Sequence, residues 1–227
     1  MMTFPEFLKE NRIFLIMITV FAVVGGILLL YIEQGDVIYF FSDNRTAAGN
    51  WIFRYGTKLG EEFAYLFILL TLLFFSYRQA IMVPILGLSV TIVSFIAKQI
   101  FSHDRPYLYF NKQGIFETIT TVDGVVLNGG ANSFPSGHTM SAFALFAFFA
   151  FCLPFKKGTA FALFTIALMV GLSRVYLVQH FFEDVYLGAL IGTLIAMGWY
   201  FLQYRIFPYP LESLDGAIRL GNRKSVA

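Results

Sequence analysis

The chain has 227 residues, of which 58% are hydrophobic and 13% are charged, and its formal net charge is +2. An apolar excess of this size, with 28 phenylalanines, indicates an integral membrane protein. The small net charge is spread along the chain, so the sequence gives no reason to expect a nucleic acid as a partner. The single cysteine, Cys152, lies in an apolar run and has no partner for an internal disulfide.

Six apolar segments are predicted to cross the membrane as helices. Residues 13–32 contain no charge and have the length of one bilayer span. The other predicted spans are 60–77, 80–97, 138–153, 158–173 and 184–202. We therefore expect an all-α fold, a six-span transmembrane helical bundle that forms a single domain over residues 1–227. Its extramembrane loops are expected on the side of the candidate site.

The segments between the spans are predicted as follows. Aromatic and basic residues near Trp51 favour a short helix on the membrane surface. Residues 98–138 form the longest polar stretch and are expected to be an extramembrane loop whose last turn, NSFPSGH, leads into a helix. The polar tail 203–227 is expected to fray.

An even number of spans places both ends of the chain on one side of the membrane. The positive-inside rule assigns that side to the cytoplasm, because most of the basic residues fall there: Lys9, Arg12, Arg78, Lys156, Lys157, Arg205, Arg219, Arg223 and Lys224. We therefore expect a multi-pass protein, in the inner membrane if the source is bacterial. The candidate site then faces the outer, periplasmic side.

One polar group interrupts the apolar C-terminal third of the chain. Arg174, His180 and Asp184 lie in the stretch GLSRVYLVQHFFED, where hydrocarbon would penalise all three side chains. His180 and Asp184 are four residues apart, so on a helix they share one face. A carboxylate in that position holds the proton on one imidazole nitrogen and leaves the other free as a base, nucleophile or metal ligand.

Two further stretches are expected to meet this group at the outer end of the bundle. In KQIFSHDRP, Lys98 and Arg105 are seven residues apart, two turns of a helix that Pro106 is predicted to end. In PSGH, residues 135–138, Ser136 and Gly137 precede a span whose free backbone amides suit an anion. Three cations, neutral donors and two histidines together predict a phosphate site, with one histidine attacking phosphorus and the other protonating the leaving oxygen.

The three stretches carry a family resemblance. The pattern Lys98-x6-Arg105-Pro106, then Pro135-Ser136-Gly137-His138, then Ser173-Arg174-x5-His180-x3-Asp184 resembles the three-part signature of the type 2 phosphatidic acid phosphatase superfamily. It matches without a gap or substitution over residues 98–184. Three motifs in this order and at these spacings are far more specific than any one of them. The six spans resemble the membrane branch, whose members are lipid phosphate phosphatases.

The resemblance implies a role for each matching residue. His180 would be the nucleophile that forms a phosphohistidine, and Asp184 would orient it. His138 would protonate the leaving group and then activate water. No metal or other cofactor would be needed. The phosphate oxygens would be held by Lys98, Arg105, Ser136, Gly137 and Arg174. The partner would be a membrane lipid phosphate or diphosphate within the bilayer, such as undecaprenyl diphosphate, phosphatidic acid, phosphatidylglycerol phosphate or a lipid A phosphate. The oligomeric state is left open.

Other interpretations stay open at this point. A metal-dependent hydrolase would use His103, His138 and His180 with nearby acids, and an anion transporter would use the charged groups as a pathway. His103 and Asp104 match no position of the signature and are interpreted as loop residues. Glu61 and Glu62 either cap the second span or face the cationic pocket and exclude wrong head groups.

Overall fold

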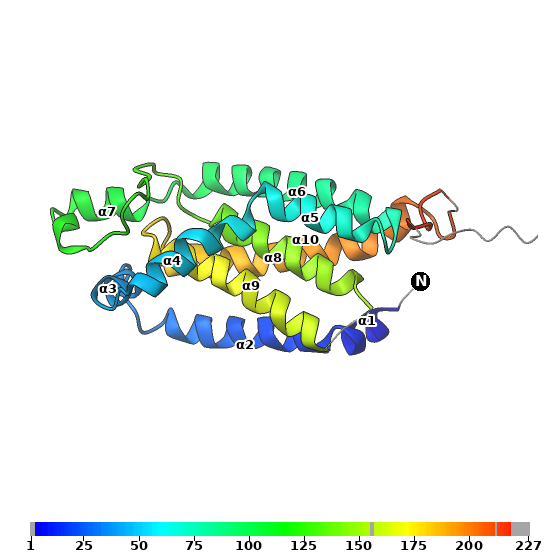
Figure 1. Ribbon diagram of the computed structural model, residues 1–227. Coiled ribbons are helices and arrows are strands. Elements are labelled where there is room, and N and C mark those ends of the chain that lie inside the picture. Colours follow the sequence, from blue (N-terminus) through cyan, green and yellow to red (C-terminus); the bar gives the residue numbers. More distant parts are fainter. Residues whose placement is uncertain (1–2, 155–156, 212, 219–227) are drawn as a thin grey trace, which may run out of the picture.

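The computed structural model describes residues 3–154, 157–211 and 213–218, and within these ranges every regular element is a helix. Figure 1 shows the elements along the long axis of the molecule. They are α1 (Phe4–Glu10), α2 (Arg12–Leu28), α3 (Asp36–Asp43), α4 (Ala47–Gly56), η1 (Thr57–Gly60), α5 (Glu62–Leu72), α6 (Tyr77–Phe101), α7 (Pro106–Lys112), η2 (Phe116–Thr118), α8 (Gly137–Cys152), α9 (Lys157–Tyr176) and α10 (Phe182–Ile206). The predicted all-α fold is confirmed.

The six predicted spans correspond to six apolar helices. By length and composition, three described segments suffice to cross a membrane: 77–112, which contains α6 and α7, 158–176 and 182–206. The pair α1 and α2, bent by 82°, is a fourth candidate, and α5 and α8 are shorter apolar helices. Large apolar side chains remain exposed along the outer faces of α2, α5 and α6, for example Val23, Phe67 and Ile92. Such a belt is what a helix needs in order to face lipid.

The centre of the bundle is α8, where every residue from Thr139 to Phe151 except Ser141 is buried. Its closest neighbour is α10, and the two backbones touch because α10 presents glycines. A methyl group on Gly192 would lie 2.3 Å from the Met140 carbonyl oxygen, and one on Gly188 would lie 2.8 Å from the Ser136 carbonyl oxygen. Small residues four apart permit this approach between membrane helices. This contact brings the start of α8 against the start of α10.

The extramembrane end is formed by α3, α4, α7 and the loop 113–132. Figure 1 shows α3, α4 and α7 at the end of the bundle opposite to α1. Two arginines pin the loop to this end: Arg45 donates to the Thr120 carbonyl at 2.7 Å, and Arg54 donates to the Asp123 carbonyl at 2.9 Å. The predicted surface helix is present as α4, with Trp51 66% exposed.

Two expectations about this end were wrong in detail. The helix carrying Lys98 ends at Phe101, where Ser102 adopts a left-handed conformation, and Pro106 begins α7 instead of ending α6. Proline suits the first position of a helix because that position needs no backbone N–H. Lys98 and Arg105 therefore lie on either side of the short non-helical link between α6 and α7. The stretch 98–138 also contains α7 and η2, so it is only partly irregular.

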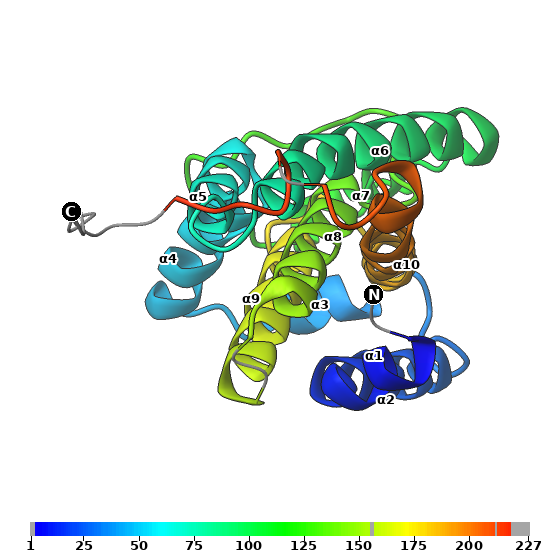
Figure 2. The same ribbon diagram turned by 90° about the vertical axis from the view of Figure 1, so that its right-hand side faces the viewer.

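At the opposite end, residues 203–211 and 213–218 of the C-terminal tail pack against the bundle, so the predicted fraying is wrong for these residues; the rest of the tail lies outside the described residues. Figure 2 shows the tail crossing the end of the bundle beside α5 and α6. Arg78 is 1% exposed and its guanidinium contacts Asp215 at 2.6 Å, while backbone bonds join Tyr77 to Gly216 and Ile218 to Leu73. Hydrogen bonds from Arg78 hold the pKa of the Asp215 carboxyl below its ordinary value. The ion pair with Arg78 and the backbone hydrogen bonds thus hold this part of the tail on the bundle although its composition is polar.

The Arg78–Asp215 pair removes one of the basic residues from which the positive-inside rule predicted the orientation in the membrane. Arg78 is buried and paired with Asp215, so it is not a free surface cation. Lys9, Arg12 and Arg205 remain on helices at the α1 end. Of the other basic residues in the count, Lys156, Arg219, Arg223 and Lys224 lie outside the described residues, as does the side chain of Lys157.

The α8–α10 contact can be tested with one methyl group. We expect Gly192→Ala to lower the free energy of unfolding by about 1–3 kcal/mol, since the added carbon meets backbone atoms that cannot move aside. Gly198→Ala is the matched control in the same helix, because nothing lies within 4 Å of its added carbon. Thermal unfolding in detergent should show a lower midpoint for Gly192→Ala alone. Equal midpoints would contradict the close-packing argument.

Candidate functional site

The imidazole of His180 and the carboxylate of Asp184 form a buried pair at the start of α10. The His180 Nδ1 atom lies 3.0 Å from Asp184 Oδ2, and their side chains are 2% and 0% exposed. His180 itself is not helical, because α10 begins at Phe182. The expectation that both residues share one helix face is therefore wrong, although the pair forms. Asp184 also accepts from the Phe181 backbone N–H at 3.0 Å, which fixes the carboxylate against the loop.

A serine completes this pair. The Ser133 hydroxyl donates to Asp184 Oδ2 and lies 3.2 Å from His180 Nδ1. A carboxylate acceptor on Nδ1 places the imidazole proton there and leaves the lone pair on Nε2. Ser133 was not singled out from the sequence, although it lies in the stretch NSFPSGH that leads into α8. Only the fold shows that this loop serine reaches α10.

The turn between Arg174 and His180 folds the chain back on itself. The backbone N–H groups of Gln179 and His180 both donate to the Arg174 carbonyl, at 2.9 and 3.2 Å. This is possible because Val178 adopts a left-handed conformation with φ of 57°. For a buried β-branched residue that conformation is rare and costs about 1–2 kcal/mol. The turn thus holds the arginine and the imidazole of the third motif together.

Two arginines are buried behind the surface of the site. Arg174 is 8% exposed and donates to the Thr57 hydroxyl at 2.9 Å, while its Nε atom is buried without a hydrogen-bond partner among the described residues. Arg105 is 7% exposed and donates to the Asn132 side chain at 2.9 Å and the Gln179 carbonyl at 3.3 Å. All these partners are neutral. The carboxylates of Glu61 and Asp184 act on Arg174 and Arg105, respectively, but neither arginine forms a direct ion pair among the described residues. Burying a cation without a directly paired charge is unfavourable, so the site is suited to an anion.

The N-terminus of α8 adds neutral donors. Ser136 is its N-cap and accepts from the Thr139 backbone N–H at 3.4 Å and hydroxyl at 2.9 Å, which leaves its own hydroxyl hydrogen to donate. Its backbone N–H donates to the Asp184 carbonyl at 3.0 Å and ties this helix start to α10. A side chain on Gly137 would stand 3.8 Å from Lys98 Nζ, so the amine faces the open side of this turn. The first amides of a helix favour negative charge.

His138 opens onto a cleft between α5, α6 and α8. Its side chain is 38% exposed, and its Nε2 atom lies 3.8 Å from Glu61 Oε1. The cleft has a volume of about 570 Å³. Its lining is mostly apolar and includes Glu61, Glu62, Tyr65, Phe95, Lys98 and His138. His138 lines the cleft, whereas His180 is buried and is not among the lining residues.

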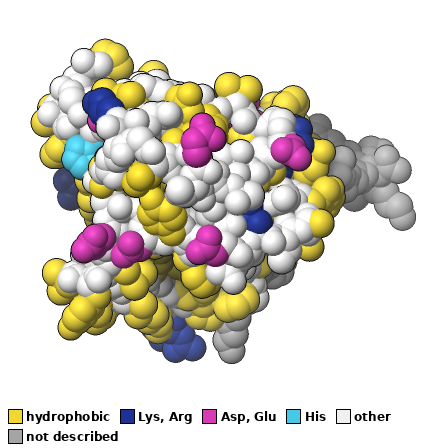
Figure 3. Space-filling model, turned by 90° about the vertical axis from the view of Figure 1, so that its left-hand side faces the viewer, with side chains coloured by type: hydrophobic (Ala, Val, Ile, Leu, Met, Phe, Trp, Pro, Cys, Tyr) yellow, Lys and Arg dark blue, Asp and Glu magenta, His cyan; other side chains and the backbone are white. Residues whose placement is uncertain are grey.

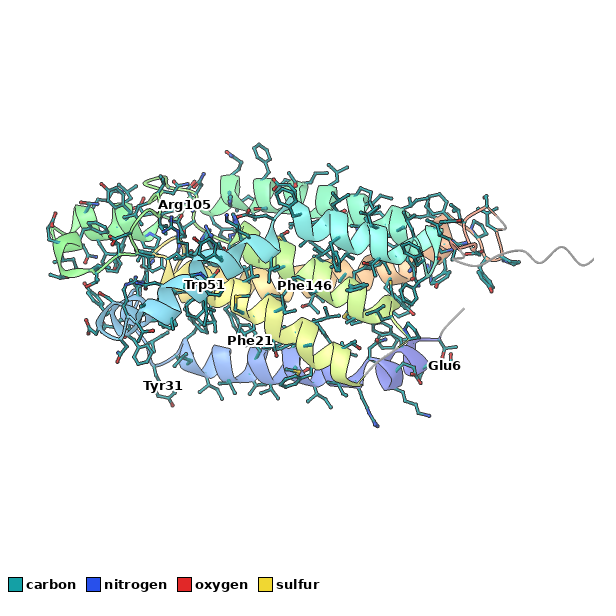
Figure 4. All side chains as sticks on the ribbon, in the orientation of Figure 1. Glu6, Phe21, Tyr31, Trp51, Arg105 and Phe146 are labelled. Carbon is teal, nitrogen blue, oxygen red and sulfur yellow. The ribbon has the colours of Figure 1, made fainter. Side chains whose placement is uncertain are left out.

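The charges of the site act on His180 from several elements. Burial, and then the positive charges of Arg105, Arg174 and Lys98, hold the pKa of the His180 imidazole well below its ordinary value. The imidazole is therefore neutral at physiological pH. All three motifs thus converge on the same space, as predicted. In Figure 4, Arg105 lies at the α7 end of the bundle and Glu6 at the other.

The end-on surface supports a site that is reached from the side. Figure 3 views the end that carries α3 and α7 and shows scattered charges with no gathering of Lys and Arg side chains. The two site arginines are buried beneath the surface of the molecule. The more accessible site residues, Lys98 and His138, instead line the cleft between α5, α6 and α8. A phosphate on a lipid has its chains in the bilayer, and this cleft lies among membrane helices.

His103 and Asp104 lie outside the signature, and the His103 carbonyl accepts from the Ser133 backbone N–H at 2.9 Å, while both side chains have partners outside the signature. The ring of His103 packs against Phe134, with centroids 5.5 Å apart, and Asp104 pairs with Lys112 at 2.6 Å. Among the residues that the structure describes, no group of three or more His, Cys, Asp and Glu side chains is arranged to hold a metal ion. Besides Ser133, sequence reasoning missed Thr57 and Asn132, which hold the two arginines. No local signal marks them.

These features define a class. The model of the PAP2 superfamily matches residues 79–208, more than half of the chain, and the chain therefore belongs to that superfamily. It is 33% identical over 106 residues to the bacitracin transport permease protein BcrC of Bacillus licheniformis, covering 47% of this chain and 50% of that protein. It is 42% identical over 71 residues to phosphatidylglycerophosphatase B of Bacillus subtilis, covering 28% and 35%. The chain thus spans half or less of these relatives.

The fold matches a solved membrane protein. The crystal structure of a transmembrane PAP2 type phosphatidylglycerolphosphate phosphatase from Bacillus subtilis aligns with a TM-score of 0.61 and 21% identity, over 88% of this chain and 98% of that one. At this identity the likeness concerns the fold. Together with the apolar helices it identifies the chain as an integral membrane protein.

The anion site can be tested without any enzymatic assay. We expect inorganic phosphate or vanadate to raise the thermal midpoint, since a ligand at about 100 times its Kd adds about 2.7 kcal/mol of stability. Arg174→Gln should remove most of this shift, because it removes a cation whose Nε atom has no hydrogen-bond partner. Sodium chloride at equal ionic strength is the control. An equal shift in the variant would contradict the site.

Proposed function

We propose that the protein is a metal-independent phosphatase that hydrolyses membrane lipid phosphates or diphosphates through a phosphohistidine intermediate. The observation that carries this proposal is the buried His180–Asp184 pair, which orients a neutral imidazole whose surroundings include the positive charges of Arg105, Arg174 and Lys98. The superfamily membership and the phosphatase named among the relatives support it.

In the first step, His180 Nε2 attacks phosphorus. The bond from phosphorus to the lipid oxygen breaks as the bond to nitrogen forms, and His138 gives its proton to that oxygen. Asp184, bonded to Nδ1–H, balances the positive charge that the phosphorylated ring acquires. Lys98, Arg105 and Arg174, with Ser136 and the Gly137 amide, stabilise the charge on the three phosphoryl oxygens.

In the second step, His138 takes a proton from water, and the resulting hydroxide attacks phosphorus. The phosphorus–nitrogen bond breaks, phosphate leaves, and both histidines return to their starting states. His138 is placed for this exchange because it is the histidine at the rim of the cleft, while His180 lies behind it. General acid and general base roles alternate on the same side chain.

The cleft supports a lipid as the substrate. It has about 570 Å³ between three membrane helices, with apolar walls that include Tyr65 and Phe95, and it ends on Lys98 and His138. A hydrocarbon chain fits the walls while the phosphate reaches the cations. Undecaprenyl diphosphate, phosphatidic acid, phosphatidylglycerol phosphate and lipid A phosphates all satisfy this geometry.

We assign the α7 end of the bundle to the outer face of the inner membrane of a bacterium. Lys9, Arg12 and Arg205 lie at the α1 end, which supports a cytoplasmic location for both termini. The clustering of the site charges at one end also favours a phosphatase over an anion transporter, whose binding groups are expected near the bilayer midplane.

The nucleophile is tested by substitution. We expect His180→Ala to reduce phosphate release from lipid phosphates by at least about a thousandfold, because no other described side chain supplies the attacking atom. His103→Ala is the matched control and should keep the rate within about threefold, since its ring packs on Phe134. Phosphate release that survives His180→Ala would overturn the mechanism.

Metal independence and substrate class are tested together. Purified protein in excess chelator should release phosphate from a panel of lipid phosphates and diphosphates at the rate seen without chelator. The described side chains offer no cluster for a metal, and three cations already provide the electrostatic stabilisation. Loss of activity in chelator that returns on adding a divalent ion would favour the metal-dependent alternative.

A further inference from the structure

Glu61 is a carboxylate that faces the exposed histidine of the site. Its Oε1 atom lies 3.8 Å from His138 Nε2, and its side chain is 36% exposed at the rim of the cleft. Glu61 occupies the N-cap position of α5 but makes no side-chain hydrogen bond to the helix. Capping therefore does not explain its orientation. Its neighbour Glu62 is the first residue of α5 and also lines the cleft.

The backbone around Glu61 is held against α8. The Ser141 hydroxyl donates to the Gly60 carbonyl at 3.0 Å and to the Tyr65 hydroxyl at 3.1 Å. A methyl group on Gly60 would lie 2.8 Å from Val170 and 3.3 Å from the His138 carbonyl oxygen, so only glycine lets the chain approach this closely. These contacts hold the chain before α5 against the first turn of α8, which brings Glu61 next to the His138 imidazole.

The charges around His138 explain why a carboxylate is needed there. Burial is the largest influence against the charged form of the His138 imidazole, and positive charges add to it from Arg174 on α9, Lys98 on α6 and Arg105 at the start of α7, and from His180 when that ring is charged. All of them favour loss of the imidazole proton. Lys58 of η1 instead lies over the Tyr55 ring at 5.6 Å. On the negative side, Asp184 is bound to His180, and Glu61 and Glu62 line the cleft.

We propose that Glu61 is a positioning residue that keeps His138 protonated and oriented for donation to the departing lipid oxygen. The inference rests on the proposed phosphatase function. His138 has to carry a proton while it stands among three fixed cations, and an opposite charge within about 4–6 Å favours the charged imidazole. In this proposal Glu61 serves His138 at the rim as Asp184 serves the buried His180, and the negative charge of Glu61 also acts on Arg174.

The experiment compares the pH dependence of phosphate release in Glu61→Gln and wild type. We expect the basic limb of the kcat profile to move about one pH unit lower, so that kcat falls about tenfold at pH 8 and recovers near pH 6. The sign follows because removing the carboxylate makes the imidazole lose its proton at lower pH. Glu61→Asp should restore part of the limb. Glu62→Gln is the control and should leave the limb in place.

A second measurement follows the protonation of His138 without any enzymatic turnover. Diethyl pyrocarbonate modifies only neutral imidazole, so the pH midpoint of His138 modification, followed by peptide mass spectrometry, should fall by about one unit in Glu61→Gln. An unchanged midpoint and a superimposable kcat profile would overturn the role of Glu61. So would a uniform loss of activity at every pH with the modification midpoint unchanged.

The outcomes also separate this inference from the proposed function. If His180→Ala keeps its activity, the phosphatase mechanism fails whatever Glu61 does. If His180→Ala is inactive while Glu61→Gln shows the wild-type limb and modification midpoint, only the role of Glu61 fails. The modification experiment depends on no substrate, and a thermal midpoint near wild type confirms that the Glu61→Gln variant is folded.

Discussion

The structure depends on keeping positive charge buried at one end of an apolar bundle. Arg105 and Arg174 are almost inaccessible, and their protein partners are neutral oxygen atoms. Burying cations in this way is unfavourable unless another charge is nearby or arrives with a ligand. The free energy comes from the rest of the fold, chiefly the dense contact of α8 with α10. Preorganised charge of this kind needs no rearrangement when the anion binds.

The glycines of α10 are the link between packing and chemistry. Because Gly188 and Gly192 let the two backbones touch, the Ser136 amide reaches the Asp184 carbonyl, and the loop before α8 brings Ser133 to the His180–Asp184 pair. The left-handed Val178 then returns the chain from Arg174 to His180. Strain in the backbone at this one residue is maintained by the packing on both sides.

The signature residues and the number of apolar helices could be predicted from the sequence, because spacing and hydrophobicity are local properties. Three features could not. Pro106 is compatible with either the end or the start of a helix, and only the fold shows that it starts α7. Ser133 acts on residues about fifty positions away. The packing of the polar tail on the bundle depends on the ion pair between Arg78 and Asp215, two residues far apart in the sequence.

That last contact has a practical meaning for handling the protein. The Arg78 guanidinium sits where α5 meets α6, and Asp215 is the carboxylate bonded to it. A truncation that removes the segment after Leu211 would leave the buried Arg78 guanidinium without its counter-ion, at the end of the bundle opposite to the candidate site. Expression trials and affinity tags should therefore retain the chain through Ile218, since shortening it further removes the contacts that hold the C-terminal tail against α5 and α6.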